Sequence, residues 1–297
     1  MANAKPEFCK RCPVGGTFND ADQTCSIPDP GDGLPVHCVG PWAEEKYSRV
    51  RKYVDISRSV RRKFVNGPGG ATYVDLFCGP GRARIRETTR IVDGSVLAAA
   101  KEAKASKTPY TGVHIADLNE SFVSAAESRL KKVGLVTKAY LGTADHTVGQ
   151  VATALGQHGL HFGFLDPYDL KSLPFSVIKR LAAFERMDML IHVSGQDLQR
   201  NLRRYIKQEQ SPLDSFAPGW RGKIDAMNSD ATVRSQIFSF WLDRIRGENM
   251  QPSQGIEEVT GTKNQHLYWL VFVARHELAI KFWEDIRSVT NQKPLAF

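Results

Sequence analysis

The residues of this chain best suited to chemistry begin in a short apolar stretch that carries one acid and runs into a glycine-containing loop. Thr72–Phe77 has the composition of a buried strand and includes Asp75, and Cys78–Gly81 follows it directly. Glycines after the first strand of an open α/β sheet let the backbone approach a ligand at the carboxyl ends of the strands. We therefore predict a cofactor-binding loop that contains Asp75, Phe77, Gly79 and Gly81.

The loop differs from a dinucleotide-binding loop in two respects. Arg84 stands where such a loop has its third glycine, and the strand carries the acid Asp75. An acid repels the pyrophosphate of a dinucleotide but suits a ligand with an ammonium group and no phosphate. S-adenosylmethionine has this chemistry, so we predict it as the cofactor; a strand–turn–helix joint with incidental glycines is the alternative.

Two further acids follow the next predicted strands. Asp117 ends the strand Val113–Asp117, where an acid can bind both ribose hydroxyls of a cofactor, and Leu118 is assigned to the same site. Asp117 lies far from the first strand, and we interpret residues 87–109 as an insertion. Asp145 is a candidate for the adenine amino group. A helix N-cap at Asp117 and a turn acid at Asp145 are the alternatives.

Asp166, Pro167 and Tyr168 are the candidate catalytic residues, because they end the fourth predicted strand. Amino-methyltransferases of nucleic acids carry Asp/Asn-Pro-Pro-Tyr/Phe there, where the acid and a proline carbonyl bind the target amine and the aromatic ring stacks on an extruded base. One proline is missing here. The alternative is a structural turn in which Asp166 contacts only the cofactor. We interpret Cys78 as a small loop residue rather than a nucleophile.

Four of the five cysteines lie in the first 38 residues, at Cys9, Cys12, Cys25 and Cys38. Four thiolates satisfy a tetrahedral zinc site, which would stabilise a segment too poor in apolar residues to form a core. His37 is a possible replacement for one ligand. An iron–sulfur cluster and four unligated cysteines are the alternatives.

Strands alternating with helices must position these residues. We expect strands at 72–77, 111–117, 136–141, 160–166, 188–193, 256–260 and 266–275, with helices that include 120–132, 175–183, 199–208, 232–246 and 277–289. Such alternation predicts parallel strands joined by helical crossovers. The predicted fold class is therefore α/β, with a seven-stranded, mostly parallel Rossmann-like methyltransferase sheet, helices on both faces and a late hairpin.

The predicted organisation has two parts. Residues 1–41 form a small cysteine-rich segment, and 42–297 form the methyltransferase-like domain, with a helical insertion at 196–254. A basic helix is expected at about 42–64, ended by the Gly-Pro-Gly-Gly run that starts at Gly67.

Charge favours an anionic partner, since the net charge is +8 and nucleic acid is the commonest such partner of basic proteins. Basic residues gather in the helix at 46–63 and at Arg200, Arg203, Arg204 and Lys207. Solvated helix faces are the alternative. The sequence has no apolar run of the roughly 18 residues that span a membrane and no signal pattern, so we expect a cytoplasmic protein that does not enter a membrane.

Several of these pieces, in their order, resemble the three-Cys-motif partner family, a group of class I methyltransferase-like proteins. The resemblance covers about residues 42–290 and rests on Val74–Gly81, Asp93-Gly94-Ser95 (which we place after the first helix), Phe164–Tyr168 with Leu173-Pro174-Phe175, and His266–Lys281. It implies the fold and S-adenosylmethionine, and no particular substrate. The family is named after cysteines in a partner protein, so it does not explain Cys9–Cys38.

The leading hypothesis is a methyltransferase that acts on RNA or DNA, with an exocyclic base amine as a candidate target. A second hypothesis is a non-catalytic module of the same fold that docks a partner enzyme, which the missing proline favours. A third is methylation of a protein or a small molecule.

Overall fold

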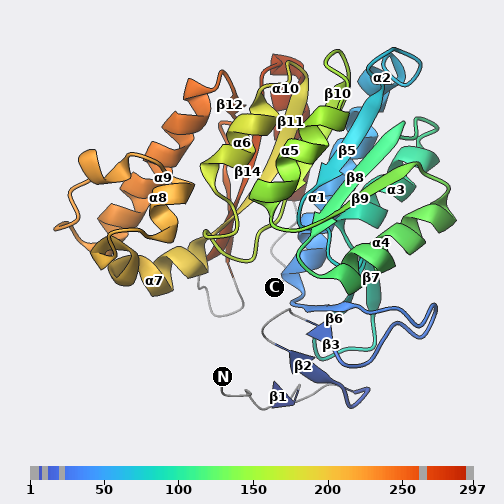
Figure 1. Ribbon diagram of the computed structural model, residues 1–297, viewed down its shortest axis with the longest axis horizontal. Helices are drawn as coiled ribbons and strands as arrows, with labels where there is room; N and C mark the ends of the chain where they lie inside the picture. Colours follow the sequence, from blue (N-terminus) through green and yellow to red (C-terminus); the bar gives the residue numbers. More distant parts are fainter. Residues whose placement is uncertain (1–6, 9–12, 20–23, 261–265, 292–297) are drawn as a thin grey trace. The chain divides into compact units, whose positions relative to one another are not determined.

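The computed structural model describes residues 7–8, 13–19, 24–260 and 266–291 (Figure 1). The chain divides into two compact units. The first is made of Met1–Asn66 and Ala71–Gly142, and the second of Gly67–Gly70 and Thr143–Phe297. Each unit is described by itself below.

Three parallel strands form the centre of the first unit. β5 (Ala71–Asp75) pairs with β8 (Gly112–Asp117), and β8 pairs with β9 (Thr137–Leu141). α3 (Ser95–Ala105) contacts β5, and α4 (Glu120–Val133) contacts β8 and β9. Every residue of β5 is buried, as expected for a strand covered on both faces. The carboxyl ends of β5 and β8 therefore open into loops beside the N-termini of helices.

A second sheet in this unit was not predicted. Its strand order is β1-β2-β3-β4-β6-β7, with bounds Glu7–Phe8, Thr17–Asn19, Thr24–Cys25, His37–Val39, Arg82–Ile85 and Ile91–Asp93. β4 pairs in parallel with β6, so sheet hydrogen bonds join the cysteine-rich segment to the chain after the glycine loop. β6 and β7 form an antiparallel pair directly before α3.

The interpretation of residues 87–109 as an insertion was wrong. The inserted element is the β6–β7 pair, and α3, at Ser95–Ala105, is the helix that follows the first parallel strand. No helix precedes Asp93-Gly94-Ser95 after the loop; these residues begin the first one. Arginines recur through this segment, at 82, 84, 86 and 90. Their charge concealed the strand pattern in the sequence.

Buried ion pairs hold the N-terminal segment in place. Arg129 on α4 is 2% exposed and binds both carboxylate oxygens of Asp32 at 2.8 Å. Arg129 also donates to the Pro80 carbonyl oxygen at 2.6 Å, and Arg82 donates to Asp29 at 2.7 Å. The Arg129 guanidinium thus connects the N-terminal segment to the glycine loop.

The predicted basic helix is two helices, α1 (Trp42–Ile56) and α2 (Arg58–Arg62). The Ser57 hydroxyl donates to the Tyr53 carbonyl oxygen where they meet. Arg61 is only 1% exposed, because it donates to the Thr108 and Val54 carbonyl oxygens. Part of the positive charge of this region is therefore structural.

The second unit is built on β10 (Leu160–Leu165) and β11 (Met187–Ser194), which run parallel. β14 (His266–Ala274) lies antiparallel to β11, and β12 (Gln251–Pro252) and β13 (Glu257–Thr260) both pair antiparallel with β14. The β13–β14 pair is the late hairpin expected from the sequence. α5 (Ala144–Ala154) packs on α6 (Phe175–Ala182), and α10 (Glu277–Asn291) packs on β14.

The predicted helical insertion forms a group beside β14, at the left of Figure 1. It contains α7 (Gly195–Lys207), α8 (Pro212–Phe216), the 3-10 helix η1 (Trp220–Gly222) and α9 (Asp230–Gly247). Phe238 on α9 stacks on Trp269 of β14 at 4.3 Å between ring centroids, and Trp241 stacks on Phe216 at 5.2 Å. Trp241 and Phe216 are buried, while Phe238 and Trp269 are partly exposed, and these ring contacts hold the helices together and against the strand.

The predicted fold class is confirmed. The protein is a mixed α/β chain with a mostly parallel, seven-stranded Rossmann-like sheet flanked by helices, and β13 is an eighth strand that pairs with β14. Within the described ranges, no helix combines the length and the apolar character needed to cross a membrane.

Candidate functional site

The glycine loop of the first unit has the backbone that the sequence led us to expect. Gly79 and Gly81 have φ values of +52° and +82°, a region that residues with a Cβ rarely adopt. The Gly94 amide donates to the Gly81 carbonyl oxygen at 2.8 Å and brings the start of α3 to the loop. The loop and a helix N-terminus therefore meet, although the β6–β7 pair separates them in sequence.

Asp75 is buried beneath this loop. Its side chain is 0% exposed and accepts hydrogen bonds from the Phe77 amide at 3.1 Å, the Ser95 hydroxyl at 2.5 Å and the Tyr73 hydroxyl at 3.3 Å. Ser95 begins α3, so this carboxylate ties the end of β5 to the helix. The geometry gives Asp75 a role in shaping the loop rather than in direct contact with a ligand.

Asp117 lies at the surface of the same site. One carboxylate oxygen accepts from the Gly79 amide and the other from the Asn119 amide, each at 3.0 Å. Burial raises the pKa of the Asp117 carboxyl, although its backbone hydrogen bonds act in the opposite direction. Each oxygen keeps a second lone pair, so the carboxylate can still accept hydrogen bonds from a diol.

Exposed apolar side chains lie next to Asp117. Leu118 is 67% exposed, and Leu141, which is paired with Asp117 across β8 and β9, is 51% exposed. Large exposed leucines at strand ends indicate a surface that a flat apolar group can cover. A carboxylate beside this surface can accept hydrogen bonds from a ligand that also covers the leucines.

His37 on β4 lies against the loop, which the sequence did not indicate. A Cβ built on Gly79 would stand 2.6 Å from the His37 ring carbon Cε1. The imidazole packs edge-on against Phe122, with ring centroids 4.8 Å apart. In the described structure His37 therefore covers the glycine.

Cys78 is buried in this loop, as expected for a small loop residue. Burial, together with Asp117 and Asp75, raises the pKa of its thiol well above the usual range. The thiolate is the nucleophilic form of cysteine, so this environment opposes a nucleophilic role.

In the second unit, Asp145 lies in the first turn of α5 and accepts a hydrogen bond from the Ser176 hydroxyl of α6. It is exposed, and its proposed contact with adenine remains a prediction.

The carboxyl ends of β10 and β11 bring Asp166 to a residue that the sequence analysis missed. Leu165 pairs with Ile191, so the next residues, Asp166 and His192, are also neighbours. The Asp166 Oδ1 and His192 Nδ1 atoms are 2.8 Å apart. The signal was present in the sequence, because His192 is a titratable residue in the apolar run Met189–Val193 of a predicted strand.

The loop after Asp166 is fixed from α7. The Leu170 amide donates to Asp197 at 3.0 Å, and the Tyr205 hydroxyl donates to the same carboxylate. Burial and the neighbouring Asp197 raise the pKa of Tyr205 to about 12. Pro167 is buried and Tyr168 is 64% exposed, so Tyr168 can meet a large partner.

The predicted metal site is described only in part. Cys9 and Cys12 lie outside the described residues, while Cys25 and Cys38 are buried free thiols in an apolar cluster with Val36. The pairing of Thr24 with His37 places both cysteines on one face of the β3–β4 pair. Over the described ranges, no group of three or more potential ligands gathers around a metal position.

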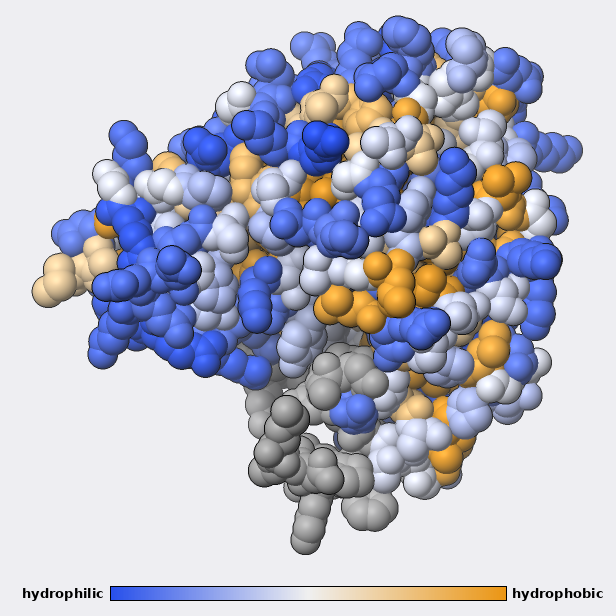
Figure 2. Space-filling model, in the orientation of Figure 1, coloured by the Kyte–Doolittle hydropathy of each residue, from blue (hydrophilic) through white to orange (hydrophobic). Residues whose placement is uncertain are grey.

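The two basic regions differ in exposure. In α1 and α2, Lys46, Arg49 and Arg61 are buried, whereas Arg51, Arg58 and Arg62 are exposed. On α7, by contrast, the predicted cations are exposed, and hydrophilic side chains cover the surface over α7 to α9 in Figure 2. The Arg203 guanidinium donates hydrogen bonds to Asp230, at 2.6 Å, and to the Ala226 and Asn228 carbonyl oxygens.

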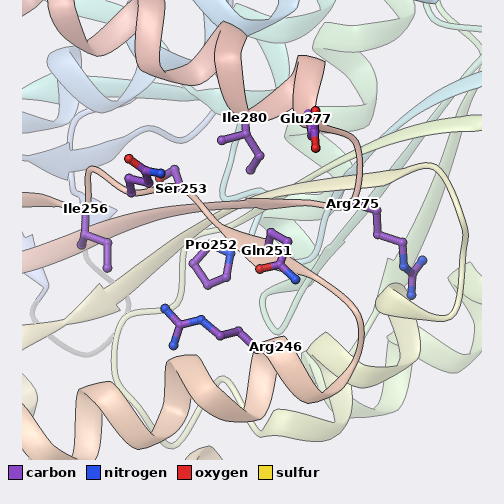
Figure 3. Close-up of a pocket in the computed structure, with 9 residues that line it drawn as sticks. Arg246, Gln251, Pro252, Ser253, Ile256, Arg275, Glu277 and Ile280 are labelled. Carbon is purple, nitrogen blue, oxygen red and sulfur yellow. The ribbon is translucent and has the colours of Figure 1, made fainter.

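A cavity of about 430 Å³ lies elsewhere in the second unit (Figure 3). It is lined by side chains from α9, β12 and the start of α10, and by Arg275. Arg275 donates to the Phe184, Ala182 and Glu248 carbonyl oxygens, so it connects chain segments. Because β14 is antiparallel to β11, this cavity is at the opposite strand ends from His192.

Comparison with known proteins gives one sequence relative. No family model matches the chain, so the resemblance to the three-Cys-motif partner family has no support from that comparison. A tape measure protein of Pseudomonas phage PAJU2 is 28% identical over 163 residues, which are 54% of this chain and 17% of that protein. The chain thus spans less than a fifth of the length of that relative.

Solved structures similar to this chain include proteins bound to S-adenosyl compounds. The O-methyltransferase from Bacillus cereus, in complex with SAH, has a TM-score of 0.46 at 13% identity over 82% of this chain and 86% of its own. The N-methyltransferase NodS from Bradyrhizobium japonicum, in complex with S-adenosyl-L-homocysteine, has a TM-score of 0.40 at 9% identity, over 80% of this chain and 89% of its own. Trm1 from Pyrococcus horikoshii, in complex with S-adenosyl-L-methionine, has a TM-score of 0.39 at 11% identity, over 86% of this chain and 60% of its own.

Proposed function

We propose that this protein is an S-adenosylmethionine-dependent methyltransferase. The observation that carries the proposal is the arrangement around Asp117. Its carboxylate is held by the Gly79 and Asn119 amides at the carboxyl ends of β5 and β8, beside the exposed Leu118 and Leu141. This position in an α/β sheet is where nucleoside ligands bind.

The residues present fit the adenosine half of the cofactor. Asp117 would accept the ribose hydroxyls, and Leu118 and Leu141 would face the adenine ring. The contact of Asp145, in the second unit, with the adenine amino group is a separate prediction. Phe77, Gly79 and Gly81 shape the loop, and Asp75 holds the loop from beneath. When bound, the cofactor supplies an activated methyl group on a sulfonium, so the protein mainly has to orient the substrate.

Calorimetric titration of S-adenosylmethionine into the wild type and Asp117→Asn tests the proposal. Loss of a hydrogen bond to a charged group costs about 1.5–3 kcal/mol, so we expect Kd to rise by about 10- to 100-fold. Asp55→Asn is the matched control, because Asp55 is an exposed acid of the same unit that pairs with Arg58. If the folded wild type does not bind, the docking-module hypothesis takes its place.

We extend the proposal to nucleic acid as the substrate. Arg200, Arg204 and Lys207 are exposed at i, i+4 and i+7 on α7 and share one face of the helix. They form a row about 10 Å long, and Tyr205, under the Arg204 guanidinium, stiffens it. A row of cations on a helix that begins directly after β11 can hold a phosphate backbone near the substrate end of the strands.

Salt dependence of binding to RNA and DNA oligonucleotides tests the extension. Each phosphate contact adds about 0.7–0.9 to the slope of log K against log salt. Replacing Arg200, Arg204 and Lys207 with alanine should reduce that slope by about 2. The matched control replaces Arg51, Arg62 and Lys63, which are exposed cations of α1 and α2. Weak binding with a flat slope would favour a protein or small-molecule substrate.

Zinc binding by Cys9, Cys12, Cys25 and Cys38 is a separate proposal. It is supported by the shared face of Cys25 and Cys38. Metal analysis of the purified chain should find one zinc per molecule, lost in Cys38→Ser. Iron with inorganic sulfide would identify a cluster instead, and a metal-free folded chain would assign these cysteines to the apolar core.

A further inference from the structure

His192 stands beside Asp166 in the second unit, and nothing in the proposed function uses it yet. We propose that the His192 Nε2 atom accepts the proton of the substrate during methyl transfer and that Asp166 positions the imidazole. This inference rests on the methyltransferase function proposed above. It replaces the direct substrate contact predicted for Asp166 with an indirect role.

The sheet register places these side chains together. β10 and β11 are parallel, and the paired positions Leu165 and Ile191 are followed by Asp166 and His192. The Asp166 Oδ1 and His192 Nδ1 atoms are 2.8 Å apart. The contact is an ion-pair distance and is not aligned as a hydrogen bond at Nδ1. The negative charge of the carboxylate still favours the proton on Nδ1, the nearer ring nitrogen, which leaves Nε2 as the acceptor of a neutral imidazole.

A third residue restrains the imidazole. Tyr268 on β14 packs edge-on against it, with ring centroids 4.4 Å apart, and is itself 3% exposed. Across the sheet, His192 of β11 pairs with Leu270 of β14, and Leu270 pairs with Glu257 of β13. The Glu257 carboxylate lies 3.9 Å from the Arg287 guanidinium. Asp166 and Tyr268 are thus two ionisable residues that contact His192.

The pair is accessible enough to meet a substrate. The side chains of His192 and Asp166 are 13% and 16% exposed. This partial burial strengthens the interaction between them while leaving a path to solvent. α7 begins at Gly195, three residues after His192, so the exposed cations of α7 extend from the same strand end.

This geometry indicates the chemical class of the substrate. In the amino-methyltransferase pattern the acid binds the target amine, but here Oδ1 of the acid faces an imidazole and the second proline is missing. A hydroxyl nucleophile, unlike a base amine, has to lose its proton as it attacks, and a histidine general base serves that need. Since a nucleic acid is the proposed substrate, the hydroxyl is the ribose 2′-hydroxyl, which only RNA carries.

The 2′-oxygen forms a bond to the methyl carbon while the bond from that carbon to the sulfonium sulfur breaks and its electron pair goes to sulfur. The hydroxyl proton moves to His192 Nε2. The resulting imidazolium is stabilised by the Asp166 carboxylate and releases the proton to solvent after the product leaves.

Nitrogen-15 NMR of the imidazole groups tests the pairing without a substrate. The chain has eight histidines, and comparison with His192→Gln assigns the signals of His192. We expect a neutral imidazole protonated on Nδ1, and an altered tautomer in Asp166→Asn. His146→Gln, at an exposed position of α5, is the control for the assignment. Protonation on Nε2 in the wild type would overturn the proposal.

Transfer of a radiolabelled methyl group to a random-sequence RNA pool and to its 2′-deoxy counterpart tests the substrate class. We expect 2′-O-methylated nucleosides from RNA alone, and a rate about 10²- to 10⁴-fold lower in His192→Gln, the usual effect of a general base. In Asp166→Asn the rate should fall, and the acidic limb of its pH profile should move to lower pH. Methylation of both pools, or of neither, would overturn the ribose assignment.

Cofactor titration separates this inference from the function on which it rests. His192→Gln should bind S-adenosylmethionine as the wild type does, because the residues assigned to the cofactor are elsewhere in the chain. If the wild type binds no cofactor, the methyltransferase proposal fails. If it binds cofactor and methylates RNA at an unchanged rate in His192→Gln, only the role of His192 fails.

Discussion

The two sets of parallel strands in this protein carry acids at their carboxyl ends, but they use them differently. In the first unit, Asp75 and Asp117 accept hydrogen bonds from amides of the loops that follow their own strands. In the second unit, Asp166 faces the imidazole of His192 on a neighbouring strand. The first arrangement fixes the backbone of a loop, whereas the second couples two groups that can exchange a proton.

This difference separates binding from chemistry. A carboxylate held by backbone amides is fixed in position and, as at Asp117, keeps a second lone pair on each oxygen, so it suits a rigid surface for a cofactor. A carboxylate next to an imidazole changes the basicity of that imidazole, and so suits proton transfer. The following predictions compare the two arrangements, beginning with the largest expected effect.

Asp75→Ala should destabilise the protein strongly, whereas Asp166→Ala should not. Removing the buried Asp75 carboxylate leaves the Phe77 amide and the Ser95 and Tyr73 hydroxyls without that acceptor. Each buried donor left without an acceptor costs about 1–3 kcal/mol, so the free energy of unfolding should fall by at least about 3 kcal/mol. Asp166 is partly exposed, so the loss there should stay below about 1 kcal/mol. Urea unfolding followed by circular dichroism measures both, and equal losses would contradict the distinction.

Asp32 should make the stability of the first unit sensitive to acid. The Arg129 guanidinium beside Asp32 holds the pKa of that carboxyl at about 2, below the usual 3.8. Its stabilisation is fully present above pH 3.8 and is lost as the pH falls through about 2. The difference corresponds to about 2 kcal/mol in the free energy of unfolding.

The test compares wild type with Asp32→Asn in urea at pH 5, 4 and 3. The two free energies of unfolding should differ at pH 5 and converge as the pH falls. Asp55→Asn is the control, because Asp55 pairs with Arg58 at the surface and such pairs contribute about 0–1 kcal/mol. A difference between wild type and Asp32→Asn that is independent of pH would refute the role of the ion pair.

Gly79→Ala should lower the free energy of unfolding by about 1–2 kcal/mol, because a residue with a Cβ is strained at positive φ. The new methyl would also stand 2.6 Å from His37 Cε1. His37→Ala in the same chain should recover the part of the loss due to this contact, but not the strain. Gly149→Ala is the matched control, since a Cβ on this residue of α5 meets nothing within 4 Å. Thermal unfolding of the wild type and these three variants completes the comparison.

The sequence predicted the parallel strands well, and the reason is physical. Buried strands such as Val113–Asp117 and Leu160–Leu165 are apolar runs bounded by turn residues, and local composition suffices to recognise them. It was less informative for β1 to β4 and for β6 and β7, which are short and rich in polar residues. Such strands depend on pairing with distant segments, as β4 does with β6.

The candidate site shows the same limit. Gly79 and Asp117 were recognisable because each follows a strand at a fixed place in the fold. His192 was not recognised as a site residue, and His37 was considered only as a metal ligand, because the contacts of both at the strand ends come from pairing. Strand register sets His192 beside Asp166, and a second sheet carries His37 to Gly79. Counting positions along two predicted parallel strands would have identified the first, but nothing local to β4 indicates the second.

The smallest predicted effect concerns the helix caps that follow the two sets of strands. Asn119 caps α4 through a 2.9 Å hydrogen bond from the Ser121 amide, and Ser194 caps α7 through a 3.2 Å bond from the Asp197 amide. Replacing either cap with alanine should cost about 0.5–1 kcal/mol, and Asn119→Ser should restore the first. The functional consequences should differ. Asn119→Ala should weaken cofactor binding slightly, because loss of the cap loosens the backbone whose Asn119 N–H donates to Asp117. Ser194→Ala should leave cofactor binding unchanged and slow methyl transfer, because Ser194 lies two residues from His192. Equal effects of both variants on cofactor affinity would mean that the two strand ends do not divide binding and chemistry in this way.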